Sequence, residues 1–401
     1  MTVRTRKIGV VGAGILGLAI ARRLAQLRPD VHITVVDKER DVAVHQTGHN
    51  SGVVHAGLYY APGSLKAEFC ARGRVLLREF CAEHALAYDE CGKVVVARRP
   101  DELHALREIE RRASANRVPG LRWLSGPQLQ EIEPEAVGEA ALHSPCTAIV
   151  DFRAIARAMA DEFVQQGHEI RLGFEVTGVR RQLGGGVVVC STDEAFAVDR
   201  LVVCAGLQSD HVARLAGDDA GPAIVPFRGE YYRLIAERSS LVRGLIYPVP
   251  DPRYPFLGVH FTRRIGGGVD VGPNAVLALA REGYRWQDVR LGEFWETVRW
   301  PGMRSLARRH WRMGLTELRG SLSRSAFLAV ARDYVPSLRA EDVEPAPAGV
   351  RAQAVDRDGS LVDDFRIHRL GPVVAVRNAP SPAATSSLAI GEYVADHVLA
   401  S

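Results

Sequence analysis

The sequence predicts a mixed α/β fold, α+β over the whole chain, that opens with a Rossmann-like βαβ unit. An apolar strand, a glycine turn and an amphipathic helix follow one another from residue 8. A turn-rich, strand-like region spans 226–270, and a last apolar strand and helix come near residue 401. With 401 residues, the chain is long enough for two or three domains, each with its own core.

The opening unit consists of a strand, a helix and a second strand. Residues 8–11 are apolar and end at a glycine, and 15–27 carry apolar side chains at the spacing of one helix face. Pro29 ends that helix, and 32–36 (HITVV) form the second strand. These residues therefore predict a βαβ unit.

The remaining elements follow from the same patterns. Apolar residues three and four apart predict helices at 65–88, 100–117, 151–166 and 286–331, and a final helix from about Ala383. Short apolar runs predict strands at 169–176, 186–191, 201–204 and 373–377.

Charge and cysteine content narrow the class of protein. The 51 basic and 47 acidic residues leave a net charge of +4, which is too balanced to indicate a nucleic-acid-binding protein. The six cysteines show neither a C-x-x-C pair nor a metal-binding spacing, so we expect reduced thiols and no metal site. We find no signal peptide and no run of about 18 apolar residues. The expected location is cytoplasmic, either free or peripheral on the inner face of the cell membrane.

Arginine dominates the basic residues. The chain has only four lysines, so 47 of the 51 basic residues are arginines. Most of this excess is expected to reflect a compositional bias. A few arginines are expected to bind carboxylates, because a guanidinium group grips a carboxylate with two parallel hydrogen bonds.

A G-x-G-x-x-G motif lies between the first strand and the first helix. Its first glycine permits the tight turn, the second lets the backbone approach a pyrophosphate, and the third allows close packing of helix and strand. An acid follows 20 residues after the last glycine, where it would bind a ribose hydroxyl. The expected cofactor contacts in this unit are Gly12, Gly14, Ile15, Leu16, Gly17, Asp37 and Lys38.

The dinucleotide is expected to be FAD rather than NAD. After Asp37, a polar, glycine-containing loop at 45–52 replaces the compact continuation that is typical of a nicotinamide enzyme. The chain also returns to its sheet only near the C-terminus, which suits a larger, elongated cofactor.

The segment 45–67 (HQTGHNSGVVHAGLYYAPGSLKA) resembles the L-2-hydroxyglutarate oxidase/dehydrogenase family. These are FAD enzymes of the broader D-amino-acid-oxidase-like superfamily. Further segments similar to that family are 226–232, 247–263, 348–353, 358–365 and 378–392, so the resemblance runs almost end to end.

The resemblance implies a fold and a reaction. A FAD-binding domain would comprise 1–90, 146–220 and 346–401, and an inserted, mostly antiparallel substrate domain would comprise 91–145 and 221–345. The implied reaction is oxidation of (S)-2-hydroxyglutarate to 2-oxoglutarate by hydride transfer to flavin N5. FAD would be bound non-covalently, and its electrons would pass to dioxygen or to a membrane quinone.

Three further regions are expected to contact FAD. Val176 would reach the adenine through its main chain, and Ala205 and Gly206 would let the backbone approach the cofactor. The two specific loops of the family would contribute Thr47, Gly48, His49, Asn50, Ser51 and Gly52, and Ser381, Pro382, Ala383, Ala384 and Thr385. The second loop precedes the last helix, whose N-terminus would stabilise negative charge at N1 and O2 of reduced flavin.

The reaction requires a base for the substrate hydroxyl, and a neutral imidazole suits this role. His55 is the first candidate, because related alcohol-oxidising enzymes have a similar histidine in the corresponding loop. His260 is the second. The alternative role for either histidine is a hydrogen bond to the cofactor or to the backbone, without a part in catalysis.

The substrate is a dianion and needs two anchors. Arg351 resembles the superfamily arginine that grips the carboxylate beside the reacting carbon, which would orient Cα–H toward N5. For the distal carboxylate, the candidates Arg228, Lys66, Tyr59 and Tyr232 stay open.

The segment 299–324 contains seven arginines against one acid, Glu317, together with Trp300 and Trp311. Such a pattern suits an anionic membrane surface, where a quinone would be met, or simply a solvated helix. Two rival functions stay open. One is a flavoenzyme of the same fold that acts on another 2-hydroxy acid, an amino acid or glycerol phosphate; the other is a non-catalytic nucleotide-binding protein.

Overall fold

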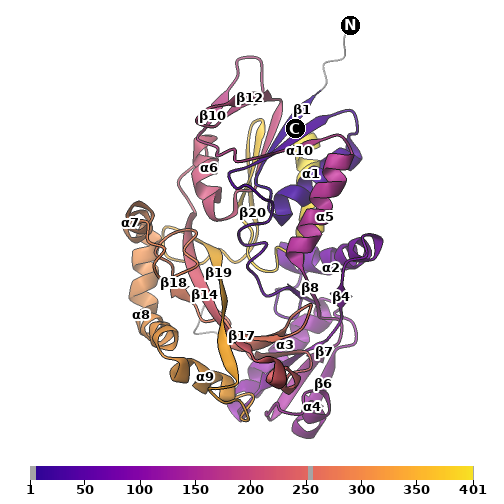
Figure 1. Cartoon of the computed structure of the whole chain (residues 1–401), viewed down its shortest axis with the longest axis vertical. Helices are drawn as coiled ribbons and strands as arrows, with labels where there is room; N and C mark the ends of the chain where they lie inside the picture. The colour runs from indigo at the N-terminus through magenta and orange to yellow at the C-terminus, as the bar shows by residue number, and fades with distance from the viewer. Residues whose placement is uncertain (1–5, 252–255, 401) are drawn as a thin grey trace.

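The computed structural model describes residues 6–251 and 256–400, and it has two parts that meet along the middle of the molecule (Figure 1). One part contains a mostly parallel sheet and both ends of the chain. The other contains a large antiparallel sheet with α7 (Leu291–Arg299), α8 (Pro301–Leu322) and α9 (Arg324–Arg332) along one side. Residues 252–255, which belong to the 247–263 segment singled out in the sequence, lie outside the described residues.

The first part is built on a six-stranded sheet with the order β20-β21-β13-β1-β2-β9. Its strands are β1 (Lys7–Val11), β2 (His32–Asp37), β9 (Glu169–Leu172), β13 (Arg200–Val203), β20 (Arg366–Leu370) and β21 (Val373–Asn378). All neighbouring pairs are parallel except β20 with β21. This arrangement confirms the predicted βαβ opening and the late return of the chain to the same sheet.

Helices cover one face of this sheet, and a small sheet with one helix covers the other. The first face carries α1 (Ile15–Leu27), α5 (Phe152–Gln165) and α10 (Ser387–Leu399), and α2 (Leu65–Glu83) packs against α10. The second face carries α6 (Ser209–Leu215) and β10 (Gly178–Arg181), β11 (Val187–Cys190) and β12 (Ala195–Val198). The parallel strands are therefore buried on both sides, which explains their almost continuous apolar sequences.

A three-stranded sheet lies at the junction between the two parts. It consists of β3 (Val53–Val54), β8 (Ala148–Val150) and β4 (Tyr88–Asp89). Because Tyr88 and Asp89 pair with β8, α2 ends at Glu83 and not at residue 88 as the sequence predicted.

The second part is built on a nine-stranded sheet with the order β18-β14-β17-β16-β15-β5-β7-β6, and β19 pairs along the edge of β14. Its strands are β5 (Lys93–Ala97), β6 (Arg122–Ser125), β7 (Ala140–Ser144), β14 (Ala223–Leu234), β15 (Leu245–Pro248), β16 (His260–Arg263), β17 (Val269–Gly272), β18 (Val276–Leu277) and β19 (Val343–Val355). Only β15 and β5 run parallel, so the inserted, mostly antiparallel sheet is confirmed. The predicted domain limits stay a prediction; β19 crosses the limit at residue 346.

Helices surround this sheet. They are α3 (Leu103–Ala115), α4 (Gly126–Ile132), α7 (Leu291–Arg299), α8 (Pro301–Leu322) and α9 (Arg324–Arg332). The single helical region expected at 286–331 is thus three helices. Pro301 starts α8, and the Ser323 side chain caps α9 by accepting from the Ala326 N–H. In the described parts of the chain, every helix is too short or too polar to cross a bilayer.

Strand alternation gives the nine-stranded sheet two different faces, because successive side chains point to opposite sides. The apolar face includes Val94, Ile246, Phe261 and Val271, and it packs on Phe327 and Leu328 of α9. The registers of neighbouring strands place a polar set on the other face, namely Lys93, Tyr247, His260, Tyr231 and Arg351. The polar face is therefore the one that requires a functional explanation.

Candidate active site

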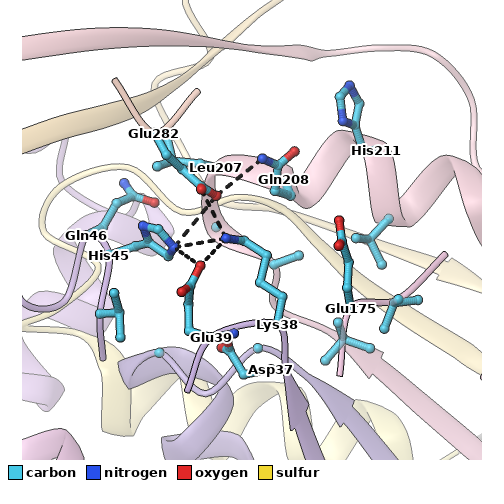
Figure 2. Close-up of a pocket in the computed structure, with 18 of the residues that line it drawn as sticks. Asp37, Lys38, Glu39, His45, Gln46, Glu175, Leu207, Gln208, His211 and Glu282 are labelled. Carbon is cyan, nitrogen blue, oxygen red and sulfur yellow. Dashed lines mark hydrogen bonds and ion pairs between the residues drawn. The ribbon is translucent and has the colours of Figure 1, made fainter. Parts of the chain in front are cut away.

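A cavity of about 1360 Å³ opens at the carboxyl ends of β1, β2 and β13 (Figure 2). This is the edge where open α/β sheets bind ligands. Eight of the residues predicted to bind a cofactor line it, namely Gly12, Gly14, Asp37, Lys38, Thr47, Val176, Ala205 and Gly206.

The glycine turn has no room for side chains. Gly12 has φ +106°, and a Cβ there would lie 2.3 Å from the Cys204 carbonyl oxygen. At Gly17, a Cβ would lie 1.9 Å from the Gly12 carbonyl oxygen, so the helix packs directly on the turn. The motif therefore exposes bare backbone beside the cavity, as a dinucleotide phosphate site requires.

Side chains hold this turn in place. Asp37 accepts a hydrogen bond from the Ala13 N–H at 2.7 Å, and Thr47 Oγ1 accepts one from the Ile15 N–H at 3.0 Å. Asn50 donates to the Gln46 and Thr47 carbonyls, which folds the 45–52 loop over the start of α1. Leu16 is half-buried in the first turn of the helix.

The opposite wall of the cavity comes from the second part of the molecule. Figure 2 shows Lys38 between Glu39 and Glu282, with an Nζ to Oε2 distance of 3.0 Å to Glu282. His45 lies 2.9 Å from Glu39, and its other ring nitrogen is 3.3 Å from the Tyr284 hydroxyl. Lys38 therefore links the two parts across the cavity mouth.

His55 follows β3, and the loop before α10 fixes its backbone. Its N–H donates to Thr385 Oγ1 at 3.1 Å, and that hydroxyl donates to the Val53 carbonyl at 3.3 Å. Among the described residues, His55 Nδ1 is buried without a hydrogen-bond partner. Burial lowers the pKa of this imidazole to about 3, with further contributions from Lys93, His260 and Lys66. The ring is therefore neutral near pH 7.

His260 lies on the polar face of the large sheet. Its ring packs on Tyr247 with 4.1 Å between centroids, and its Nδ1 is 2.9 Å from the Gly258 carbonyl oxygen. That contact makes Nδ1 the donor and leaves Nε2 as an acceptor. Burial lowers the pKa of His260 to about 3, with Arg351 and Lys93 acting in the same direction.

Arg351 lies on β19 at the same face. Its guanidinium lies 5.4 Å from the centre of the Phe256 ring, and no carboxylate within residues 6–251 and 256–400 pairs with it. Glu317 is near enough for the charge of Arg351 to act on its carboxyl group, but the two make no direct ion pair, so the guanidinium is available to an anionic ligand.

Residues 7–397 match the family model of the FAD-dependent oxidoreductases (DAO). The chain belongs to this family. An L-2-hydroxyglutarate dehydrogenase from Indibacter alkaliphilus is 44% identical over 97% of this chain and 98% of its own. The dehydrogenase of that name from Escherichia coli K12 is 43% identical, covering 97% and 92%. The human mitochondrial one is also 43% identical, covering 98% and 88%.

Solved structures show the same fold. The L-α-glycerophosphate oxidase from Mycoplasma pneumoniae, with FAD bound, has a TM-score of 0.79 at 22% identity and covers 99% of this chain and 95% of its own. Glycine oxidase from Geobacillus kaustophilus has a TM-score of 0.71 at 19% identity, with the same coverage of 99% and 95%.

The cofactor of this FAD-dependent oxidoreductase is FAD, and the residues present fit it. The bare turn at Gly12 and Gly14 suits the pyrophosphate, and Asp37 at the end of β2 suits a ribose hydroxyl. His55, whose Nδ1 is buried without a partner among the described residues, does not line this cavity.

The loops 45–52 and 381–385, which resemble those of the family, are closely packed. The His49 ring lies tilted against the Tyr284 ring, with 4.3 Å between centroids, and a Cβ on Gly349 would come within 2.5 Å of the His49 carbonyl oxygen. The 45–52 loop thus packs two residues from Arg351. A Cβ added at Gly48 or at Gly52 would lie 2.7 Å from a backbone carbonyl oxygen. Ser51, Ala383 and Ala384 are half-buried, Pro382 and Thr385 are buried, and Ser381 is exposed.

The sequence candidates for the distal carboxylate separate in space. Arg228 is buried, and its guanidinium lies 3.0 Å from the Glu230 carboxylate. Its side chain points to the face of the sheet opposite to that of Arg351. Tyr232 lies on that opposite face too, 5.0 Å from Phe327 between ring centroids. The structure therefore does not bring Arg228 or Tyr232 to His260.

Lys66 lies near His55, and Tyr59 lies near Lys93. Lys66 Nζ pairs with Asp363 at 2.7 Å and lies 5.6 Å from the Tyr60 ring. The Tyr59 hydroxyl is buried and has no partner among the described residues, and its ring lies 4.8 Å from Lys93 Nζ.

Lys93 is the residue that the sequence analysis missed. It is 1% exposed, it begins the apolar run of β5, and its Nζ lies 4.8 Å from the Tyr247 ring as well. Burial lowers its pKa to about 8. A lysine at the start of a strand is ordinarily exposed, so the available signal was weak: it is one of only four lysines in the chain.

Proposed function

We propose that this FAD-dependent oxidoreductase oxidises L-2-hydroxyglutarate, (S)-2-hydroxyglutarate, to 2-oxoglutarate. Relatives that carry the name L-2-hydroxyglutarate dehydrogenase are 43–44% identical over almost the whole chain. The observation that carries the proposal is that His260 and Arg351 share the polar face of the large sheet, while His55 Nδ1 is buried without a partner among the described residues.

The proposed chemistry divides the work between these side chains. Bound FAD supplies a hydride acceptor at N5. Arg351 holds the carboxylate beside Cα and thereby orients the Cα–H bond. His55 takes the hydroxyl proton while the Cα–H electron pair leaves as hydride, so that a carbonyl forms at C2. His260 is the alternative base, through its free Nε2.

Two loops are proposed to hold the flavin. Residues 381–385 lie directly before α10, and Thr385 binds the backbone of His55, so this loop and the base keep a fixed relative position. We expect Ser381, Pro382, Ala383, Ala384 and Thr385 to face the N1–O2 edge, where backbone amides stabilise the reduced flavin. FAD is proposed to be held without a covalent bond.

Anaerobic mixing with the two enantiomers of 2-hydroxyglutarate tests the proposed substrate. Bleaching of the flavin by the S form alone is expected. Bleaching by glycerol 3-phosphate or glycine in place of 2-hydroxyglutarate would contradict the substrate, and a preparation that no substrate bleaches would contradict catalysis altogether.

The variant His55→Ala tests the base. Flavin reduction should slow by at least about 100-fold, the usual effect of removing a general base, while the FAD content is unchanged. The matched variant His260→Ala should lower the rate less. If the two effects are reversed, His260 is the base.

The electron acceptor is proposed to be a quinone at an anionic membrane surface, which α8 would contact. The exposed arginines of 299–324 are accompanied by Trp311, 56% exposed, and Leu322, 74% exposed. Trp300 is excluded from this surface, because its indole N–H donates to the Val355 carbonyl at 3.0 Å. Arginine charge and apolar side chains on one helix favour anionic lipid.

Sedimentation with vesicles tests the proposed surface. At physiological salt, the protein should pellet with vesicles in which about a third of the lipid is anionic, and it should stay in solution with neutral vesicles. The variant Trp311→Ser with Leu322→Ser should bind less. Reoxidation of the reduced flavin by dioxygen faster than by a quinone analogue would contradict the proposed acceptor.

A further inference from the structure

Lys93 occupies a position that the proposed reaction does not yet explain. It lies on a strand inside the large sheet, paired with Leu245 of β15 on one side and with Ser144 of β7 on the other. Its side chain points to the polar face, where the aromatic rings of Tyr59 and Tyr247 each lie 4.8 Å from Nζ. A buried ammonium group normally requires an anionic partner.

The surroundings of Lys93 contain no such partner within the described residues. The groups that favour its charged form are the thiols of Cys70 and Cys146, and no carboxylate is among them. The two aromatic faces attract a cation but do not neutralise its charge. The ammonium group therefore keeps unused hydrogen-bond donors in a buried place.

Two neighbouring side chains share this property. The Tyr59 hydroxyl and His55 Nδ1 are also buried without a partner in the part of the chain that the structure describes. Buried polar groups in native proteins are nearly always paired, so a cluster of unpaired ones points to a ligand that pairs with them.

The position of Lys93 relative to Arg351 suits a ligand with two negative ends. His260 lies on β16, between β5 on one side and β19 on the other in the strand order. Arg351 and Lys93 both act on the His260 imidazole from these two sides. A molecule that places its reacting carbon near the histidines would therefore present one end to each cation.

We propose that Lys93, together with the Tyr59 hydroxyl, binds the carboxylate at the far end of the substrate and makes the enzyme select dicarboxylic over monocarboxylic 2-hydroxy acids. This inference rests on the proposed function. It replaces the candidates Arg228 and Tyr232, which face away from His260.

The test compares two substrates of the same chain length in wild type and Lys93→Met. Methionine has a similar length and no charge, so it removes the ammonium group and keeps the volume. With L-2-hydroxyglutarate, KM should rise about 10- to 150-fold, the effect of losing a hydrogen bond to a charged group, with little change in the limiting rate of flavin reduction. With L-2-hydroxyvalerate, which lacks the distal carboxylate, kcat/KM should stay the same or rise. FAD content and melting temperature report on folding.

The outcomes separate the two proposals. If wild type is not reduced by L-2-hydroxyglutarate, the proposed function fails. If wild type is reduced and the variant keeps both its KM and its preference over L-2-hydroxyvalerate, the role of Lys93 is refuted and the function stands. A merely structural role would raise KM for both substrates alike, which would also refute the assignment.

A second measurement needs only the wild type, should the variant lose FAD. Binding of glutarate and of valerate is followed through the absorbance of oxidised flavin. Glutarate should bind at least about 10-fold more tightly than valerate at pH 7, because only glutarate has a second carboxylate for the ammonium group. Equal affinities at pH 7 would overturn the proposal.

Discussion

The contact between Thr385 and the backbone of His55 can be tested with two conservative substitutions. Thr385→Val keeps the shape of the side chain but removes the hydroxyl that accepts from the His55 N–H and donates to the Val53 carbonyl. Thr385 is 1% exposed, so water cannot replace either bond. A buried donor left without a partner costs about 1–3 kcal/mol, and we expect a total loss of about 2–3 kcal/mol.

Thr385→Ser is the matched control, because serine keeps the hydroxyl and loses one buried methyl group, which costs about 1 kcal/mol. For a chain of 401 residues, the average unfolding entropy per residue converts these losses into decreases in melting temperature of about 2–4 °C for valine and about 1 °C for serine. Scanning calorimetry of the FAD-loaded proteins measures both. A valine variant that melts as high as the serine variant would refute the reasoning, because shape would then matter more than the hydroxyl.

Three other predictions concern the substrate anchor Arg351, the glycine turn at Gly12 and the pKa of His260. Arg351→Lys keeps the charge but loses the planar fork, so KM for L-2-hydroxyglutarate should rise at least about 10-fold; an unchanged KM would remove Arg351 as the anchor. Gly12→Ala should abolish retention of FAD on dialysis, because the new Cβ would meet the Cys204 carbonyl, whereas Gly63→Ala, also at positive φ but with nothing within 4 Å, should retain it. Burial lowers the pKa of His260 to about 3 from an ordinary value near 6.5, so the unfolded chain binds more protons between these values and stability falls as pH is lowered through this window. His260→Gln should therefore lose less melting temperature between pH 6.5 and pH 4 than wild type, and equal losses would contradict the shift.

The features that the sequence predicted correctly are those set by neighbouring residues. The βαβ opening depends on a glycine turn between a strand and a helix that adjoin it in the chain, and the structure shows why Gly12 and Gly17 cannot carry a side chain. The fold class was predictable for the same reason, together with the resemblance of the two specific loops to a known family.

The features that the sequence could not predict depend on strand register. Arg228 and Arg351 are both arginines in strand-like segments, and only the pairing of Arg228 with Val350 shows that they face opposite sides. Likewise, Lys93 reaches the polar face because β5 pairs with β15, whose residues are about 150 positions away in the sequence. Such pairings between distant segments leave no local pattern.

The packing of α10 has a consequence for the order in which the protein is made. A Cβ on Gly391 would lie 2.9 Å from the Ala19 carbonyl oxygen, so α1 has its backbone directly against the last helix of the chain. At a synthesis rate of about 5–20 residues per second, roughly 20–70 s pass between Leu27 and Ser387. During this time α1 can pack against α5, which ends at Gln165, but its contact with α10 is still missing. The core of the opening unit is therefore completed only by a helix that lies more than 350 residues further along the chain.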